Sequence, residues 1–181
     1  MITVCKVVVC RGRLSDTPEL LCSAIHDRYS CRLFVPNRNV PGEVIAKLLT
    51  AASKAPSGKN GQPWRFRVLA DESVQTVAAM LPNNKWLQNV VQMIAVFMDT
   101  ANVYDIEKDT MAIGACVENM ILEATANGVQ SCWIGECSNY KDEICEILGV
   151  EKRYSLMALV AIGYGKKLSQ AKRLDINDLM I

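Results

Sequence analysis

Apolar residues in this chain follow helical and extended patterns in turn, and the order of these patterns limits the fold more than any other feature. Periods near 3.6 predict helices, and short apolar runs between turn formers predict strands. The predicted helices cover residues 18–27, 43–54, 71–80, 109–127 and 140–148, and the predicted strands cover 65–70, 92–99, 130–135 and 155–163. These segments do not keep the regular strand–helix–strand repeat of a parallel sheet. We therefore predict an α+β fold with a central mixed or mainly antiparallel sheet flanked by helices, followed by a polar tail.

The longest predicted helix, 109–127, carries a stripe of mostly small side chains and ends at Gly128, a natural C-cap. Small side chains allow another helix to approach closely. The stripe comprises Ala112, Ala115, Cys116, Asn119, Leu122 and Ala126. This pattern is typical both of a tightly packed core within one chain and of an interface between subunits.

The size and charge of the chain exclude several classes of protein. Its 181 residues suit a single domain over 1–181, in which residues 1–20 form an arm of uncertain role. The formal net charge of +1 gives no basic field for nucleic acid. No apolar run approaches the roughly 20 residues that cross a bilayer, and the apolar segment 2–10 precedes Arg11 and Arg13, the wrong charge order for a signal peptide. We expect a cytoplasmic protein that contacts neither nucleic acid nor membrane.

Cysteine and histidine usage argues against a metal site. The eight cysteines include no Cys-x-x-Cys pair, and His26 is the only histidine. We expect reduced thiols that are mostly buried. The chain also lacks glycine-rich dinucleotide and phosphate loops and the nucleophile motif of hydrolases. An enzyme so poor in acid–base and nucleophilic groups would take its reactivity from a cofactor.

Residues 55–64 (APSGKNGQPW) form the most informative segment for function. Turn formers are concentrated between a predicted helix and a predicted strand. A surface loop of small polar residues suits the binding of a ligand through backbone amides and hydroxyls. The same residues also suit an ordinary helix-to-strand turn, with Trp64 in the core.

Three further segments combine with this loop into an ordered set of motifs. They are residues 28–34 (RYSCRLF), residues 112–122 followed by 128–135 (GVQSCWIG), and residues 159–165 followed by 172–174. Together they resemble the motifs of the FMN-dependent nitroreductase family, in the family's own order, over residues 20–178. Tyr29, Leu87 and Gly165 depart from the pattern, where relatives often have Arg or His, Lys, and Pro.

The resemblance implies that the first segment holds the phosphate and ribityl end of FMN. Arg28 and Ser30 would bind there, because Arg presents a fixed fork of donors and Ser adds a hydroxyl. Tyr29 would contact FMN through its backbone, and Arg32 would either bind FMN or be structural. Taken alone, the same segment is also typical of a solvated basic stretch.

The resemblance assigns the loop to the FMN of the neighbouring subunit, through Pro56, Ser57, Gly58 and Asn60. In the tail, Arg173 or Lys172 would return to the phosphate, although a solvated charged tail is the alternative.

The strand at 130–135 and Asn84 would surround the flavin ring. The resemblance places the backbone N–H near Gly135 opposite flavin N5, since glycine permits close backbone approach. Ile134 would pack against the ring beside Trp133, and Asn84 would touch the ribityl chain or the ring edge. By pattern alone, Trp133 and Ile134 are core residues.

The resemblance implies an intertwined, obligate homodimer with FMN at its interface. Such an enzyme takes a hydride from NADH or NADPH and reduces a small electrophilic acceptor, of the nitroaromatic or quinone type, by a ping-pong mechanism. No side chain is identified as catalytic, because flavin N5 carries the chemistry. The alternatives are a specialised flavin reaction such as reductive dehalogenation, a flavin-binding protein without turnover, and an interaction protein that has lost the cofactor.

Overall fold

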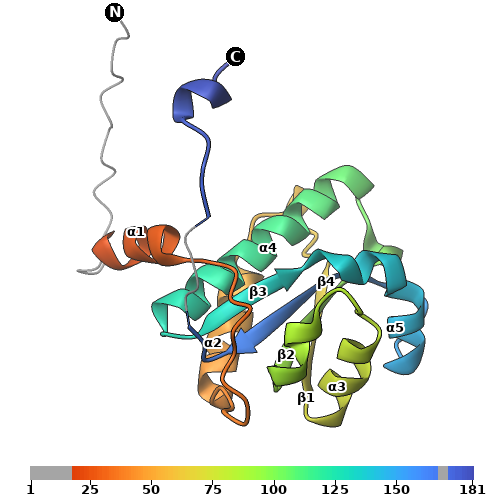
Figure 1. Cartoon of the computed structure of the whole chain (residues 1–181). Helices are drawn as coiled ribbons and strands as arrows, with labels where there is room; N and C mark the ends of the chain where they lie inside the picture. The colour runs from red at the N-terminus through yellow and green to blue at the C-terminus, as the bar shows by residue number, and fades with distance from the viewer. Residues whose placement is uncertain (1–17, 167–170) are drawn as a thin grey trace, which may run out of the picture.

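The computed structural model describes residues 18–166 and 171–181, with the side chains of residues 18–22 left out. Within these residues, one antiparallel sheet has the strand order β1-β2-β4-β3 (Figure 1). The strands are β1 (Trp64–Ala70), β2 (Gln92–Asp99), β3 (Gln130–Ile134) and β4 (Tyr154–Gly163). The predicted α+β class and antiparallel sheet are confirmed. Strands β2 and β4 form the centre of the sheet, which agrees with their strongly apolar sequences.

Helices cover both faces of this sheet. They are α1 (Pro18–Asp27), α2 (Gly42–Ser53), α3 (Glu72–Ala79), α4 (Ile106–Ala126) and α5 (Lys141–Ile147). Helices α2 and α4 contribute to one core together with inward-facing residues of β2 and β4. Helices α3 and α5 contribute to a second core on the opposite face. The side chains of β2 and β4 alternate between the two cores, as the period of two in a strand requires.

Helix α4 differs from its prediction at its start and on its buried face. It begins at Ile106 rather than 109, because the Asp105 carboxylate accepts a hydrogen bond of 3.0 Å from the Lys108 N–H and caps the helix. Its end was predicted correctly, with Gly128 at a φ of 69°. Ala112 and Cys116 of the predicted small stripe are buried, and the buried face also includes four larger side chains: Ile113, Val117, Met120 and Ile121.

The extended segment between α1 and α2 lies against the ends of β3 and β4. Ser30 forms a parallel bridge with Ser131, and Phe34 forms an antiparallel bridge with Gly165. At Gly165, an added Cβ would lie 2.6 Å from the Leu33 carbonyl oxygen. Glycine is therefore required here because the two backbones approach closely, which explains one departure from the family pattern.

The described end of the chain, residues 171–181, lies away from the sheet (Figure 1). It contains one short 3₁₀ helix, Ile176–Leu179. Its side chains are exposed, including five apolar ones: Leu174, Ile176, Leu179, Met180 and Ile181. We expected a polar tail; its side chains are indeed exposed, but the expectation missed the apolar ones.

Candidate functional site

Backbone pairing brings the basic segment 28–32 to the start of β3. The bridge between Ser30 and Ser131 fixes this position. Burial raises the pKa of the nearby Cys132 thiol, and the positive charges of Arg32 and Arg28 oppose the rise. Two predicted phosphate ligands therefore lie near each other, beside an exposed Ser30.

Among the described residues, Arg28 forms one weak ion pair. Its Nε lies 3.8 Å from Oε1 of Glu118 on α4, and both side chains reach solvent. Ion pairs of this kind contribute about 0–1 kcal/mol, so the guanidinium can still bind an anion. Tyr29, between Arg28 and Ser30, packs against the second core, and burial raises the pKa of its hydroxyl.

The end of β3 presents an exposed aromatic ring and an open backbone position. Trp133 is 42% exposed, whereas Ile134 is only 3% exposed and lies in the second core. A Cβ added at Gly135 would meet no atom within 4 Å. The space beside Gly135 can therefore admit another group, and contact with Ile134 is limited mainly to its backbone.

Asn84 is held next to this open position. The amides of Asn83 and Asn84 donate hydrogen bonds to the two carboxylate oxygens of Glu136, the residue after Gly135. The Asn84 side-chain oxygen accepts a hydrogen bond of 2.9 Å from Trp86 Nε1. The structure thus places Asn84 close to Gly135, and the contact of either residue with flavin stays a prediction.

The loop of residues 56–62 has an unusual backbone conformation. Lys59, Asn60 and Gln62 have φ values of 52°, 54° and 47°, in the left-handed region. Such conformations cost non-glycine residues on the order of 1–3 kcal/mol, and they are easiest for Asn. Internal hydrogen bonds partly offset this cost, because Ser57 Oγ accepts from the Gln62 N–H at 3.0 Å. The exposed Pro56 lies at the start of the loop.

The loop lies near the start of α4, whereas segment 28–32 contacts the helix beyond its midpoint. Gly58 packs so closely on Tyr104, just before α4, that an added Cβ would lie 2.8 Å from its ring. The partner of Arg28, Glu118, is twelve residues into the helix, which corresponds to about 18 Å from Ile106. The structure therefore does not bring the two groups of predicted ligands together within one chain.

The two basic tail residues lie on the last described segment of the chain. Lys172 and Arg173 are exposed, in the segment that lies away from the sheet. Their assignment to a phosphate stays a prediction.

The described residues contain no group of three His, Cys, Asp or Glu side chains that could hold a metal ion. Cys31, Cys116, Cys132 and Cys137 are buried free thiols, as predicted, and Cys145 is half-buried. Burial raises the pKa of Cys116 to about 12 and that of Cys137 to about 11, so both are protonated and unreactive. No helix in the described ranges combines the length and apolar character needed to cross a membrane.

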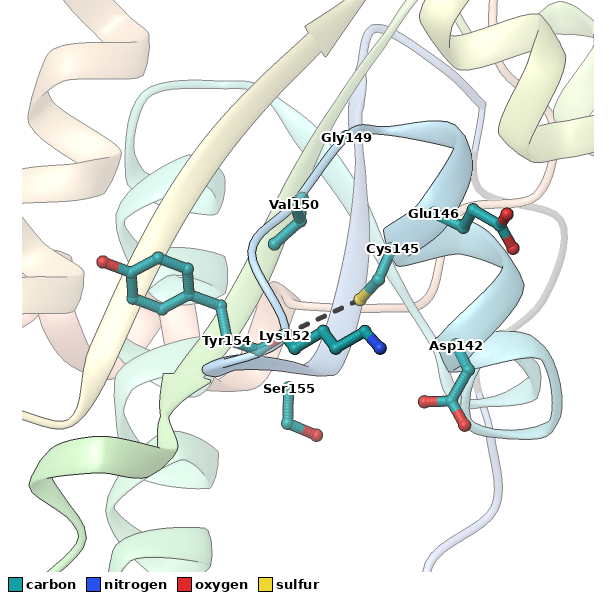
Figure 2. Close-up of a pocket in the computed structure, with 8 residues that line it drawn as sticks. All are labelled: Asp142, Cys145, Glu146, Gly149, Val150, Lys152, Tyr154 and Ser155. Carbon is teal, nitrogen blue, oxygen red and sulfur yellow. Dashed lines mark hydrogen bonds between the residues drawn. The ribbon is translucent and has the colours of Figure 1, made fainter.

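One cavity of about 750 Å³ lies between α5 and the start of β4 (Figure 2). Its walls include Asp142, Glu146, Lys152 and the Cys145 thiol, and burial raises the pKa of that thiol. None of the predicted flavin ligands lines it. It is therefore separate from the candidate site.

Comparison with known proteins identifies the family. The model of the nitroreductase family matches residues 25–99 and 76–164. The chain belongs to the nitroreductase family. The match includes the 28–34 segment, the loop and β3, which are among the motifs that the sequence singled out, and it ends before residues 172–174.

Individual relatives agree with this assignment. A protein of Archaeoglobus fulgidus assigned as an NADH dehydrogenase/NAD(P)H nitroreductase is 30% identical, over 78% of this chain and 83% of its own length. A Desulfovibrio desulfuricans protein assigned as a nitroreductase, crystallised with FMN, is 30% identical with a TM-score of 0.85. That likeness covers 92% of this chain and 97% of the other. An iodotyrosine dehalogenase 1 homolog of Caenorhabditis elegans is 46% identical over 50 residues, which are 28% of this chain and 15% of that protein.

Three buried polar groups near the site were missed by sequence reasoning. Ser131 Oγ and Asp109 Oδ1 have no hydrogen-bond partner among the described residues. Asp99 accepts hydrogen bonds from two arginines, Arg65 and Arg153. An acidic residue at the end of the buried strand β2 was the available signal for Asp99, but its partners are far away in sequence.

Proposed function

We propose that this nitroreductase is an FMN-dependent oxidoreductase that uses NADH or NADPH to reduce a small nitroaromatic or quinone-type acceptor. The observation that carries the proposal is the likeness to the D. desulfuricans protein, whose crystal structure contains FMN. That likeness extends over nearly the whole of both chains, and its 30% sequence identity indicates more than a shared fold.

The residues present fit FMN. Arg28 and Arg32 supply positive charge beside Ser30 for a phosphate. At the other end of β3, Trp133 offers an exposed ring and Gly135 an unobstructed backbone. When bound, FMN supplies hydride transfer between the nicotinamide and the acceptor. The protein's own residues bind the phosphate, orient the ring and limit access to it.

We further propose that the functional unit is a homodimer in which each site uses both chains. The loop at Gly58 lies far along α4 from Arg28, so it can complete a site only with a second copy. Exposed apolar side chains at the N-terminal end of α4, including Ile106 and Met111, suit an isologous interface. The apolar tail provides more such surface, and Lys172 and Arg173 would reach a phosphate when the tail packs against the partner.

The proposal can be tested by purification and stepwise reduction. The protein should be yellow, and NADH or NADPH should bleach its flavin absorbance under anaerobic conditions. Addition of a nitroaromatic or quinone should then restore the absorbance. Colourless, folded protein that takes up no added FMN would contradict the proposal, and a yellow protein that neither cofactor bleaches would indicate flavin binding without turnover.

Reductive dehalogenation is a second candidate, supported by the short similarity to the C. elegans dehalogenase homolog. Its small coverage of both proteins makes it the weaker candidate. Iodide release from iodotyrosine, measured beside nitroaromatic reduction with the same reduced protein, separates the two activities.

A further inference from the structure

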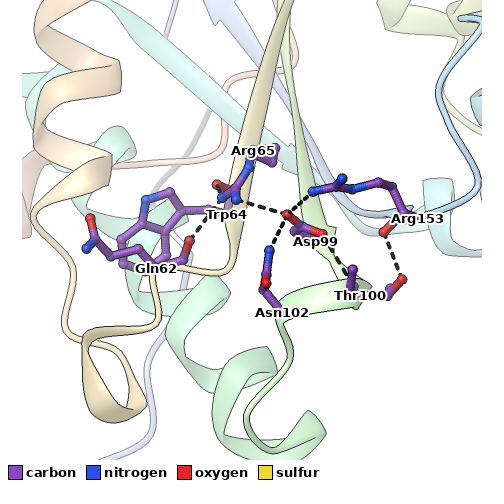
Figure 3. Close-up of polar contacts among 8 residues, drawn as sticks. Gln62, Trp64, Arg65, Asp99, Thr100, Asn102 and Arg153 are labelled. Atoms are coloured by element: carbon purple, nitrogen blue, oxygen red, sulfur yellow. Dashed lines mark hydrogen bonds and ion pairs between the residues drawn. The ribbon is translucent and has the colours of Figure 1, made fainter.

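A buried carboxylate joins the ends of the strands next to the loop of residues 56–62. The Asp99 side chain, at the end of β2, is fully buried. Its Oδ2 accepts hydrogen bonds from Arg65 at 2.9 Å, Arg153 at 2.8 Å and Asn102 at 2.9 Å. Figure 3 shows Asp99 between the two arginines, which come from β1 and from the residue before β4. A buried charge of this kind requires such partners.

Only one of the two arginines also reaches the loop. Arg65 donates through Nη1 to the carbonyl oxygens of Trp64 at 2.8 Å and Gln62 at 3.1 Å (Figure 3). Gln62 is the last loop residue with a left-handed φ, and its N–H is bonded to Ser57. The guanidinium therefore connects the buried carboxylate directly to the loop.

Arg153 has the same partner but a different second role. Its carbonyl oxygen accepts hydrogen bonds of 2.8 Å from the backbone and hydroxyl of Thr100, and its guanidinium lies 4.7 Å from the centre of the Tyr154 ring. These contacts hold the turn after β2. The two arginines are thus a natural pair for comparison, because each neutralises Asp99 but only Arg65 contacts the loop.

The loop conformation needs an external constraint. Three of its residues, Lys59, Asn60 and Gln62, have left-handed φ values and none is glycine. Strained conformations persist where the surrounding structure determines them, and they concentrate at ligand-binding sites. The fork of donors on Arg65 supplies such a constraint, because one planar group holds two carbonyls and a carboxylate at once.

We propose that Arg65, oriented by Asp99, is a positioning residue that holds residues 57–62 in the conformation that contacts FMN across the dimer. The proposal rests on the proposed function for its ligand. The contacts between Arg65, Asp99 and the loop are independent of that function.

The test compares Arg65→Ala and Arg65→Lys with Arg153→Ala in the purified dimer. Two quantities are measured: amide hydrogen exchange of peptides covering residues 57–62, and the dissociation constant of FMN. We expect both Arg65 variants to exchange faster in this loop and to bind FMN about tenfold more weakly, since lysine keeps the charge but lacks the fork. Arg153→Ala should leave loop exchange and FMN affinity within about twofold of the parent, although it loses a comparable contact with Asp99.

Each contrary result has a distinct meaning. Unchanged loop exchange in the Arg65 variants, or an equal increase in Arg153→Ala, would overturn the constraint. Faster exchange with unchanged FMN affinity would overturn the positioning role. If the parent itself binds no FMN, the proposed function fails along with the positioning role, while the exchange measurement still decides whether Arg65 constrains the loop. If Arg65→Ala does not fold, Arg65→Lys provides the same comparison with the charge on Asp99 retained.

Discussion

The two halves of the proposed flavin site are held by different forces. Segment 28–32 is held by backbone pairing at the start of β3, and it carries the cations Arg28 and Arg32 on an extended backbone. Residues 57–62 form a loop with left-handed residues, fixed by side chains that reach it from the sheet and from Tyr104. One half is thus built mainly from the backbone, and the other depends on a few specific side chains.

The difference indicates where each half tolerates change. Backbone pairing is insensitive to most substitutions but fails where an added side chain separates the strands. A side-chain constraint fails when a single guanidinium is lost. Since the two halves are also far apart along α4, the proposed association of two chains would bring them into one site.

The largest effect is expected from breaking the association that joins the halves. Met111→Lys places a charge on an exposed apolar position of α4, which the proposed dimer buries twice. Loss of a buried methionine costs about 1.5–3 kcal/mol per copy, so the dimer should dissociate and release FMN in parallel. Ile147→Lys on α5, also exposed and apolar, is the matched control. Sedimentation analysis that finds Met111→Lys as dimeric as the control would place the interface elsewhere.

The next effect is confined to the half that binds the phosphate. Arg28→Ala should weaken FMN binding by about 1.5–3 kcal/mol, because it removes a charge-assisted hydrogen bond. Arg38→Ala is the control, because it removes the same charge from a side chain outside the proposed phosphate site. The Arg38 guanidinium lies 3.6 Å from the centre of the Tyr164 ring. Titration with FMN measures both, and equal affinity in Arg28→Ala and the parent would exclude the phosphate role.

A third prediction tests the backbone pairing itself. Gly165→Ala puts a methyl group 2.5 Å from Cys31 Sγ and 2.6 Å from the Leu33 carbonyl oxygen. Crowding of this kind costs about 1–3 kcal/mol, and thermal unfolding should show it as lower stability. Gly42→Ala, where a Cβ meets nothing within 4 Å, should be close to neutral. Faster hydrogen exchange at 28–35 with an unchanged loop would show that the halves are held independently.

The smallest effect is expected in the pH dependence of stability, through the Asp99 carboxylate that supports residues 57–62. The hydrogen bond from Arg153, opposed by burial and supported by Asn102, lowers the pKa of Asp99 below its usual value of 3.8. A carboxyl whose pKa is lowered by folding stabilises the protein above the unfolded value and loses this contribution as the pH falls through the folded value. Asp99→Asn should therefore differ most from the parent near neutral pH and progressively less below about pH 4. Denaturant unfolding at several pH values measures this, and a constant difference would contradict it.

Much of the fold could be predicted from local pattern. The four strands and most helix ends follow from apolar runs and turn residues, so strand β2 was predicted with the same bounds as observed. The start of α4 was missed, because two acidic residues, Asp105 and Asp109, can each cap a helix and only the structure shows which does.

The candidate site could be predicted only in part. Asn84 and Gly135 were each assigned to the flavin by resemblance, but the Glu136 carboxylate that holds Asn84 beside Gly135 was not expected. The resemblance placed Ile134 against the ring, and the pattern alone placed both Ile134 and Trp133 in the core; the Ile134 side chain lies in the core, whereas Trp133 is exposed. Neighbouring side chains of a strand, such as Trp133 and Ile134, point to opposite faces of the sheet. Which of the two is exposed depends on which face is covered by other elements.

The sequence by itself determined the elements, the absence of a Cys-x-x-Cys metal motif and the ordered motifs of a nitroreductase. These depend on short-range rules of periodicity, capping and residue chemistry. The tertiary structure decided that Arg28 and the loop contact α4 far from each other, and that Asp99 joins Arg65 to Arg153. Asp99 is 34 positions from Arg65 and 54 positions from Arg153 in the sequence. Contacts over such separations depend on how the sheet packs, and no local pattern encodes that packing.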